Sequence, residues 1–362
     1  MRYGIWTPLP HTIRPEERMT KAIEILKGAE SKDPADPSFD FAVEVLRRAE
    51  QLGFDVTLIA ARQLGPDLEA WTMASALSAY INQMELMVAV HPGINSPQMV
   101  AKMGASLDRI SGGRASINVV NGWNVDEFNI FGNGAWLTDL NDRYLRMNEY
   151  IRILKGLWTE DSFEFQGKFY KVEHGNLPLK TRQRPNPPIY AASSSSDGKE
   201  TVARYCDYWF VPDRGDYRLF DETIAHIERE IADMEERAGR YGRRIRYGKS
   251  AHVICADTVE DANAQADSFV AYGNIVRYNK SAMVALNACL VGTADMIADR
   301  IRTYERIGVD MLMLHFHPMI EGMERFVAEV LPRLETVQYS RACEPGSTLT
   351  VAPPSPGTVA SR

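Results

Sequence analysis

The 362-residue chain has little of what marks a specialised class of protein. Its four cysteines lie far apart, which indicates neither the close pairing of a metal site nor a disulfide framework. Lysine and arginine total 41 against 48 acidic residues, and the basic residues are interspersed, so there is no electrostatic footprint for nucleic acid or anionic lipid. No apolar run reaches membrane-spanning length, and the opening MRYGIWTPLP reads as a strand rather than a signal peptide. We expect a cytoplasmic protein that binds a small molecule and contacts neither nucleic acid nor membrane.

The signatures of several enzyme classes are also missing. There is no G-x-S-x-G elbow and no Cys/His signature, so covalent hydrolysis is not indicated. The segment Gly132-Asn133-Gly134 lacks a third glycine and a preceding strand, which argues against a dinucleotide site. His315-Phe316-His317 has no carboxylate at a recognisable spacing, so we predict no metal.

What the chain does have is an alternation of helical and strand-like periods from one end to the other. Hydrophobic content of 45% with 25% charged residues is ordinary for a globular protein. Eight segments are apolar and β-prone: 3–7, 56–60, 84–90, 115–121, 189–192, 208–211, 246–254 and 311–314. Eight strands separated by helices favour a closed α/β TIM barrel over an open doubly wound sheet. We predict a single barrel domain over residues 1–340.

Three segments interrupt this rhythm. Residues 161–172 alternate aromatic and polar side chains about a glycine, which predicts an inserted hairpin. Residues 272–289 have the length and mixed character of a mobile lid, from which Lys280 could enter a site. Residues 344–362 are rich in Pro, Ser, Thr and Gly and are expected to be disordered.

Residues 97–123 show how such a barrel would present a site. Helical spacing predicts that five residues share one helix face: Met99, Val100, Met103, Leu107 and Ile110. Gly112 and Gly113 can adopt the left-handed conformation that ends a helix. The following strand ends in Asn121, Gly122 and Trp123, and barrel enzymes keep their chemistry just past the carboxyl ends of strands. An ordinary helix-turn-strand unit is the alternative.

Other polar residues follow predicted strands in the same way. Residues 193–196 put hydroxyls and backbone donors at a helix start, which suits either phosphate binding or simple capping. Arg143 could fork onto phosphate oxygens and Tyr144 could border a flat ring, although a surface ion pair is the commoner fate of such an arginine. Arg62 and Glu127 likewise could lie at the active face of the barrel or could form surface ion pairs.

Three of the seven histidines lie in or just after the last two predicted strands. His252 lies within the seventh strand, and His315 and His317 stand at the end of the eighth, facing one side. Imidazole suits proton exchange near neutral pH or contact with an anion. The alternative for each is a buried histidine with its hydrogen bonds satisfied.

Several motifs, in order and spacing, carry a family resemblance: SGGRASINVVNGWNVDEF, DRYLRMNEYIRILKGLW, FEFQGKFYKV, IYAASSSS and IGVDMLMLHFHP. Together they resemble the bacterial luciferase-like flavin monooxygenases, over residues 3 to about 334. The most similar subgroup contains the alkanesulfonate, dimethylsulfone and pyrimidine monooxygenases.

The resemblance implies a TIM barrel that binds reduced FMN and uses dioxygen, through a flavin peroxide, to oxygenate a small substrate. It also implies a separate NAD(P)H-dependent flavin reductase and a homodimer or dimer of dimers. The implied flavin contacts are Ala61, Arg62, Asn118, Glu127, Arg143, Tyr144, Ser194 and Ser195. His252 and His317 would serve as substrate or proton-relay groups, and Trp123 as a wall of the pocket.

Departures from the alkanesulfonate enzymes bear on the substrate. Ser250 stands where those enzymes have an anion-binding arginine, and His317 roughly where they have a tyrosine. The cysteine that follows their second strand has no counterpart at residues 63–67. We therefore expect a neutral or weakly polar organosulfur substrate such as a sulfone. The alternative substrate is a nitrogen heterocycle. The alternative functions are a deazaflavin-dependent oxidoreductase and a flavin carrier without turnover.

Overall fold

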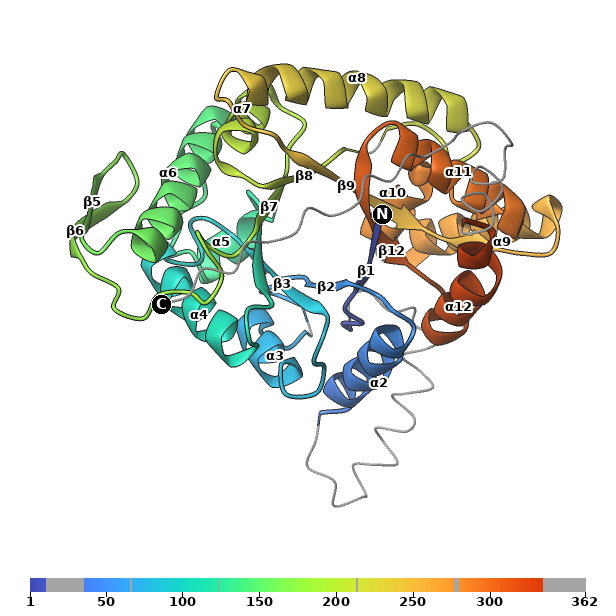
Figure 1. Cartoon of the computed structure of the whole chain (residues 1–362), viewed down its shortest axis with the longest axis horizontal. Helices are drawn as coiled ribbons and strands as arrows, with labels where there is room; N and C mark the ends of the chain where they lie inside the picture. The colour runs from blue at the N-terminus through green and yellow to red at the C-terminus, as the bar shows by residue number, and fades with distance from the viewer. Residues whose placement is uncertain (11–35, 66, 123, 213, 277–279, 335–362) are drawn as a thin grey trace, which may run out of the picture.

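Eight parallel strands close into a barrel in the computed structural model, which describes residues 1–10, 36–65, 67–122, 124–212, 214–276 and 280–334. Around the barrel the order is β1-β12-β9-β8-β7-β4-β3-β2 (Figure 1). The strands are β1 (Arg2–Trp6), β2 (Val56–Ile59), β3 (Glu85–Val90), β4 (Ala115–Val119), β7 (Ile189–Ala192), β8 (Tyr208–Phe210), β9 (Arg246–His252) and β12 (Val309–His315). All eight predicted strands are present, and the TIM-barrel prediction is confirmed.

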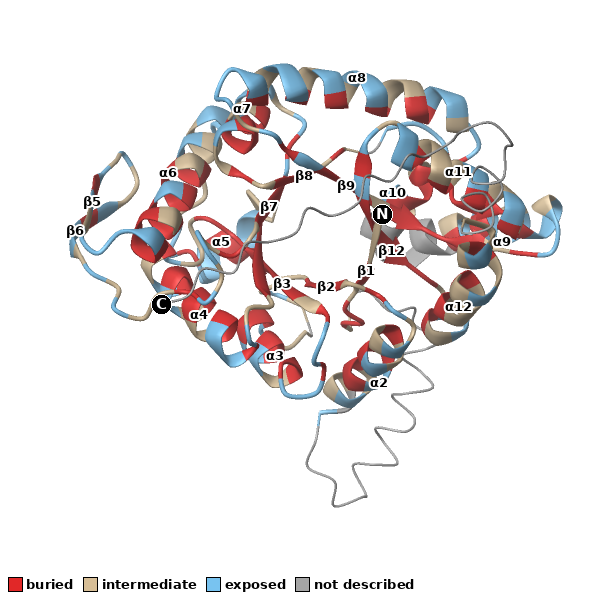
Figure 2. Cartoon of the chain, viewed as in Figure 1, coloured by how far each residue is buried: buried red, intermediate tan, exposed pale blue. Residues whose placement is uncertain are grey.

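Helices surround this barrel and bury the sides that face it (Figure 2). The helices are α2 (Pro37–Gln51), α3 (Ala70–Leu77), α4 (Pro97–Ile110), α5 (Val125–Ile130), α6 (Leu140–Thr159), α7 (Ser196–Tyr205), α8 (Phe220–Gly239), α9 (Val259–Val276), α10 (Lys280–Ala285), α11 (Ala294–Arg306) and α12 (Met319–Arg325). Two short helical segments are η1 (Leu286–Ala288) and η2 (Phe326–Val330). Among the described residues, no helix is long and apolar enough to cross a membrane.

Helix α4 differs from the sequence prediction in the face that it buries. Val100 and Leu107 are buried as expected, but Met99 and Ile110 are 57% and 69% exposed. The buried side is the one that packs against α6. There the Trp158 ring of α6 lies so close to Gly104 of α4 that a Cβ at this glycine would be 3.0 Å from it. Gly112 and Gly113 end the helix at φ 78° and 97°, as predicted.

Two small sheets lie outside the barrel. The strands β5 (Phe163–Gln166) and β6 (Lys171–Gly175) pair antiparallel where the sequence predicts a hairpin (Figure 1). The strands β10 (Ile254–Cys255) and β11 (Val291–Gly292) pair parallel in the segment between β9 and α11.

That segment between β9 and α11 has its own apolar cluster, which includes Ile254, Ala262, Phe269, Leu286 and Val291. It contains most of the predicted lid, where the structure has the end of α9, α10 and η1. Residues 277–279, the side chain of Lys280 and the predicted tail at 344–362 lie outside what is described.

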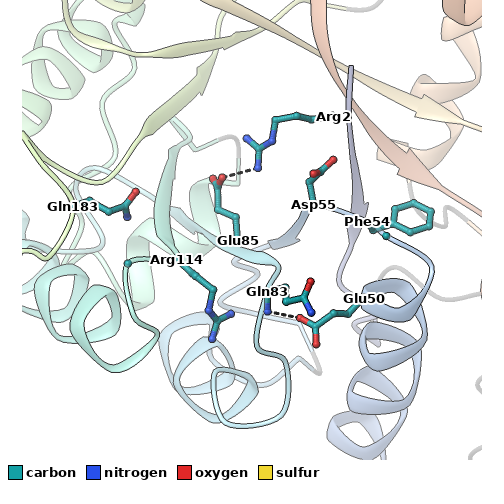
Figure 3. Close-up of a pocket in the computed structure, with 10 residues that line it drawn as sticks. Arg2, Glu50, Phe54, Asp55, Gln83, Glu85, Arg114 and Gln183 are labelled. Carbon is teal, nitrogen blue, oxygen red and sulfur yellow. Dashed lines mark hydrogen bonds and ion pairs between the residues drawn. The ribbon is translucent and has the colours of Figure 1, made fainter. Parts of the chain in front are cut away.

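The amino-terminal end of the barrel holds a polar pocket of about 410 Å³ (Figure 3). The Glu50 carboxylate accepts hydrogen bonds from the backbone N–H groups of residues 82–84. The Arg114 guanidinium donates to three backbone carbonyls, and Arg2 pairs with Glu85 at 2.8 Å. These charged groups therefore fasten loops and strands together, and this pocket is not the candidate site. In TIM barrels this face serves stability.

Candidate active site

Large side chains fill the barrel interior at its amino-terminal half, and small ones line it toward the carboxyl end. The large buried residues are Val56, Leu58, Met87, Tyr190, Tyr208, Met311 and Met313. Ala60, Ala89 and Ala192 stand two residues beyond Leu58, Met87 and Tyr190 and therefore on the same face, and Ser250 follows Gly248 in the same way on β9. Ala192 is exposed although it ends β7. Barrel enzymes bind their substrates at this carboxyl end, which we call the barrel mouth.

The start of α7 gathers hydroxyl groups and a tyrosine at this end of the barrel. Ser195 is the N-cap, and its Oγ accepts from the N–H of Gly198 at 3.2 Å. The Oγ of buried Ser193 lies 3.5 Å from that of Ser195. A Cβ at Gly198 would lie 2.4 Å from the Tyr144 ring, so only glycine permits this approach. The structure thus brings together Tyr144 and the 193–195 serines, beside the positive end of a ten-residue helix.

Glu127 and Arg62 also meet, as the sequence analysis places them. Glu127 is on α5 and is only 2% exposed. Its Oε1 accepts from the N–H of Gln63 at 3.1 Å and lies 4.0 Å from Arg62 Nε. The buried carboxylate therefore holds the loop that follows β2, which also carries half-buried Ala61.

Two asparagines present buried amide groups near the end of β4. Asn118 is 8% exposed, and its Oδ1 has no hydrogen-bond partner among the described residues. In Asn121 both side-chain polar atoms are buried and lack a partner within that same set. A buried amide without a partner costs about 1–3 kcal/mol, so these groups are suited to a polar ligand. A flat heterocycle with both donors and acceptors matches the two amides.

Arg143 is engaged differently from both sequence interpretations. Its Nε donates to the carbonyl of Leu137, and its guanidinium lies 3.7 Å from the centre of the Trp136 ring. The side chain is therefore held by the loop that precedes α6. Trp123, the third predicted catalytic residue, lies outside the described residues.

The histidines belong to a row of rings that runs from inside the barrel to α9. His315 stacks on Trp6 with ring centroids 4.7 Å apart. His252 lies 6.2 Å from His315, Phe269 lies 4.5 Å from His252, and His317 lies 6.4 Å from Phe269. His252 is 1% exposed, whereas His317 is half-buried.

Sequence reasoning did not single out Trp6 or Phe269, which the structure places in this row of rings. Trp6 ends the first strand on the interior side, a signal that was available in the sequence. Phe269 offered no such signal, since it lies in a helix of the inserted segment.

Comparison with known proteins shows which family this chain resembles over most of its length. A family model described as luciferase-like monooxygenase matches residues 1–311. An FMNH2-dependent dimethylsulfone monooxygenase of Pseudomonas putida is 31% identical over 335 residues, covering 83% of this chain and 90% of that protein.

Solved structures agree on the fold. EDTA monooxygenase from Chelativorans sp. BNC1 superposes with a TM-score of 0.72 at 17% identity, covering 93% of this chain and 94% of the other. Monooxygenase RslO1 from Streptomyces bottropensis gives 0.70 at 20% identity, covering 92% and 99%. The family predicted from the sequence is confirmed, and so is the prediction that the protein is a flavin-dependent monooxygenase. This chain belongs to the luciferase-like monooxygenase family.

Proposed function

We propose that this protein is a two-component monooxygenase that uses reduced FMN and dioxygen to oxygenate a small, neutral organosulfur compound of the sulfone type. The observation that carries this proposal is the 31% identity to a dimethylsulfone monooxygenase over most of both chains. The barrel mouth supports it, because its polar groups suit a phosphate and a flat polar ring.

The residues present fit FMN. The start of α7, with Ser194, Ser195 and Tyr144, would hold the phosphate through hydroxyl and backbone donors. Asn118 and Asn121 have buried amide groups available for the edge of a ring, which explains why these atoms lack partners in the described structure. FMN, when bound, supplies the activation of dioxygen.

The chain's own residues orient the reactants and exclude water. Glu127 fixes the loop after β2, so that Ala61 and the Arg62 guanidinium keep one position at the mouth. The stacked rings of Trp6 and His315 line the interior of the barrel. His252 and His317 are the groups we assign to substrate binding and proton transfer. Trp123 is assigned to the pocket wall.

The side chains of β9 that face the barrel interior suit a neutral substrate. Ser250 faces inward there, between Gly248 and His252, and its buried Oγ has no partner among the described residues. A hydroxyl can donate to a sulfone oxygen but does not balance the charge of a sulfonate. We therefore place sulfones ahead of sulfonates.

The test is a product screen with reduced FMN supplied by a flavin reductase. Dimethyl sulfone, methanesulfonate and a pyrimidine are each incubated with enzyme and oxygen, and products are read by mass spectrometry. We expect dimethyl sulfone to yield methanesulfinate, with the C–S bond broken and the departing methyl carbon released as formaldehyde, while reduced FMN is oxidised and the second oxygen atom leaves as water. A ring-opened amide from the pyrimidine alone would overturn the substrate assignment. Tighter anaerobic binding of a reduced deazaflavin than of reduced FMN would overturn the cofactor. Size-exclusion chromatography with light scattering tests the homodimer that we also propose.

A further inference from the structure

A second cavity lies beside the barrel mouth, between α9 and the turn that follows β12. It has a volume of about 560 Å³, within the usual range for small-molecule sites. Its outer rim consists of exposed residues of the inserted segment, including Asp257, Asp261 and Gln265. Its inner end is formed by His252 and Phe269, which are buried. The cavity therefore leads from solvent to a histidine of the barrel interior.

The row of rings connects this cavity to the barrel interior. His252 lines the cavity and also approaches His315, which stacks on Trp6 inside the barrel. The Phe269 ring stands edge-on to His252 and lies between it and His317. A molecule in the cavity would therefore meet Phe269 and His252 before it reached the mouth.

The cavity and the proposed flavin groups occupy opposite arcs of the barrel. The flavin candidates follow β2, β4 and β7, whereas the cavity follows β9 and β12. In the closed order, β1 separates the two arcs on one side and β8 on the other. A cofactor bound on the first arc would leave the second as an approach to the mouth.

The charges that line the cavity favour a neutral molecule. Arg325 is the one arginine or lysine among the described residues that line the cavity, and it pairs with Asp257 and with Glu329. The other lining carboxylate, Asp261, accepts from Thr258. Two lining carboxylates against one guanidinium repel a sulfonate and impose no penalty on a sulfone.

We infer that this cavity is the access chamber through which a neutral organosulfur substrate reaches the barrel mouth, and that Phe269 sets the size it admits. The inference rests on the proposed function. The chamber is large compared with dimethyl sulfone, so the ring at its inner end is the element that discriminates among longer dialkyl sulfones.

The test compares dimethyl, diethyl and dibutyl sulfone in the reductase-coupled assay. Phe269→Ala is expected to raise the dibutyl-to-dimethyl ratio of kcat/KM by roughly tenfold, and Phe269→Trp to lower it, because a pocket discriminates by methylene count on this scale. FMN affinity should stay within about twofold of wild type, since the flavin groups lie elsewhere. Phe269→Leu, which keeps an apolar side chain in the cluster, should give an intermediate ratio.

Phe165→Ala is the matched control. Phe269 and Phe165 are 5% and 8% exposed, but Phe165 lies in the β5–β6 hairpin outside the barrel. An equal change in the sulfone ratio for both alanine variants would overturn the inference, because it would reflect lost packing. Saturation-transfer NMR of dibutyl sulfone with flavin-free protein gives a second readout, independent of turnover. Loss of the signal in Phe269→Trp supports the chamber, and an unchanged signal overturns it. If wild type oxygenates no sulfone, the proposed function fails, while the NMR result still decides the chamber.

Discussion

The imidazole of His315 stacks on the indole of Trp6, with centroids 4.7 Å apart and an interplanar angle of 23°. The two residues end the last and the first strands of the barrel, which pair in parallel. The stack therefore covers the seam at which the barrel closes, and it also forms part of the interior wall of the barrel. Trp6 Nε1 is buried without a partner among the described residues, which places another donor on that wall.

Replacing His315 separates the packing of this ring from its polar function. His315→Phe keeps a stacked ring but removes both nitrogens, and we expect kcat/KM to fall by roughly tenfold, as for one lost hydrogen bond. His315→Ala should lower both kcat/KM and the melting temperature. Steady-state kinetics and thermal unfolding measure these effects. Full activity in His315→Phe would show that the residue only packs.

Glu127 is expected to affect flavin affinity through the loop that it holds. Glu127→Gln replaces the charged acceptor of the Gln63 N–H, and we predict roughly tenfold weaker FMN binding in a fluorescence titration. The control is Glu149→Gln. Glu149 is also buried and accepts from three backbone N–H groups, but these belong to the β5–β6 turn, outside the barrel. Equal losses of affinity in both variants would contradict the role assigned to Glu127.

Ser195 is predicted to matter for the phosphate in particular. Ser195→Ala removes an N-cap, at a cost of about 1 kcal/mol of stability, and should weaken FMN but not riboflavin. Thr293→Ala removes the equivalent cap of α11 and should lower stability alone. Calorimetric titration with both flavins checks this. A similar loss of affinity for riboflavin would indicate a general disturbance of the mouth.

His91 predicts an acid-sensitive fold. It is 3% exposed in the loop after β3, and burial lowers its pKa from 6.5 to about 4. Between these values the unfolded chain binds more protons than the folded one, so stability falls as pH drops below 6.5 and levels off below 4. At pH 5 the contribution is a loss of about 2 kcal/mol relative to pH 7.5.

The measurement is urea unfolding of wild type and His91→Gln at both pH values. The variant should lose less stability than wild type on acidification. The control is His174→Gln, because that side chain is 95% exposed. Parallel pH dependence in wild type and His91→Gln would refute the assignment.

Local sequence patterns were enough to locate the elements of this fold. The boundaries of α4 match the prediction because Pro97 starts the helix and Gly112 ends it, and both signals lie within the segment itself. The sequence Gly-X-Asp occurs where two of the strands begin, as Gly53-Phe54-Asp55 and Gly308-Val309-Asp310, and its role depends on the tertiary structure. The Asp55 carboxylate accepts from the N–H of Tyr3 at 2.7 Å, and Asp310 accepts from Tyr247 at 2.9 Å, so each aspartate fastens the neighbouring strand.

What the sequence by itself determined is the order of strands and helices and the family, because these depend on periodicity, turn chemistry and motif. Only the tertiary structure decided that Met99 faces solvent, that Arg143 rests on Trp136, and that Phe269 closes a cavity against His252. Each of these outcomes depends on which distant segments pack together. Periodicity along one segment does not specify the neighbour that will bury or expose its side chains.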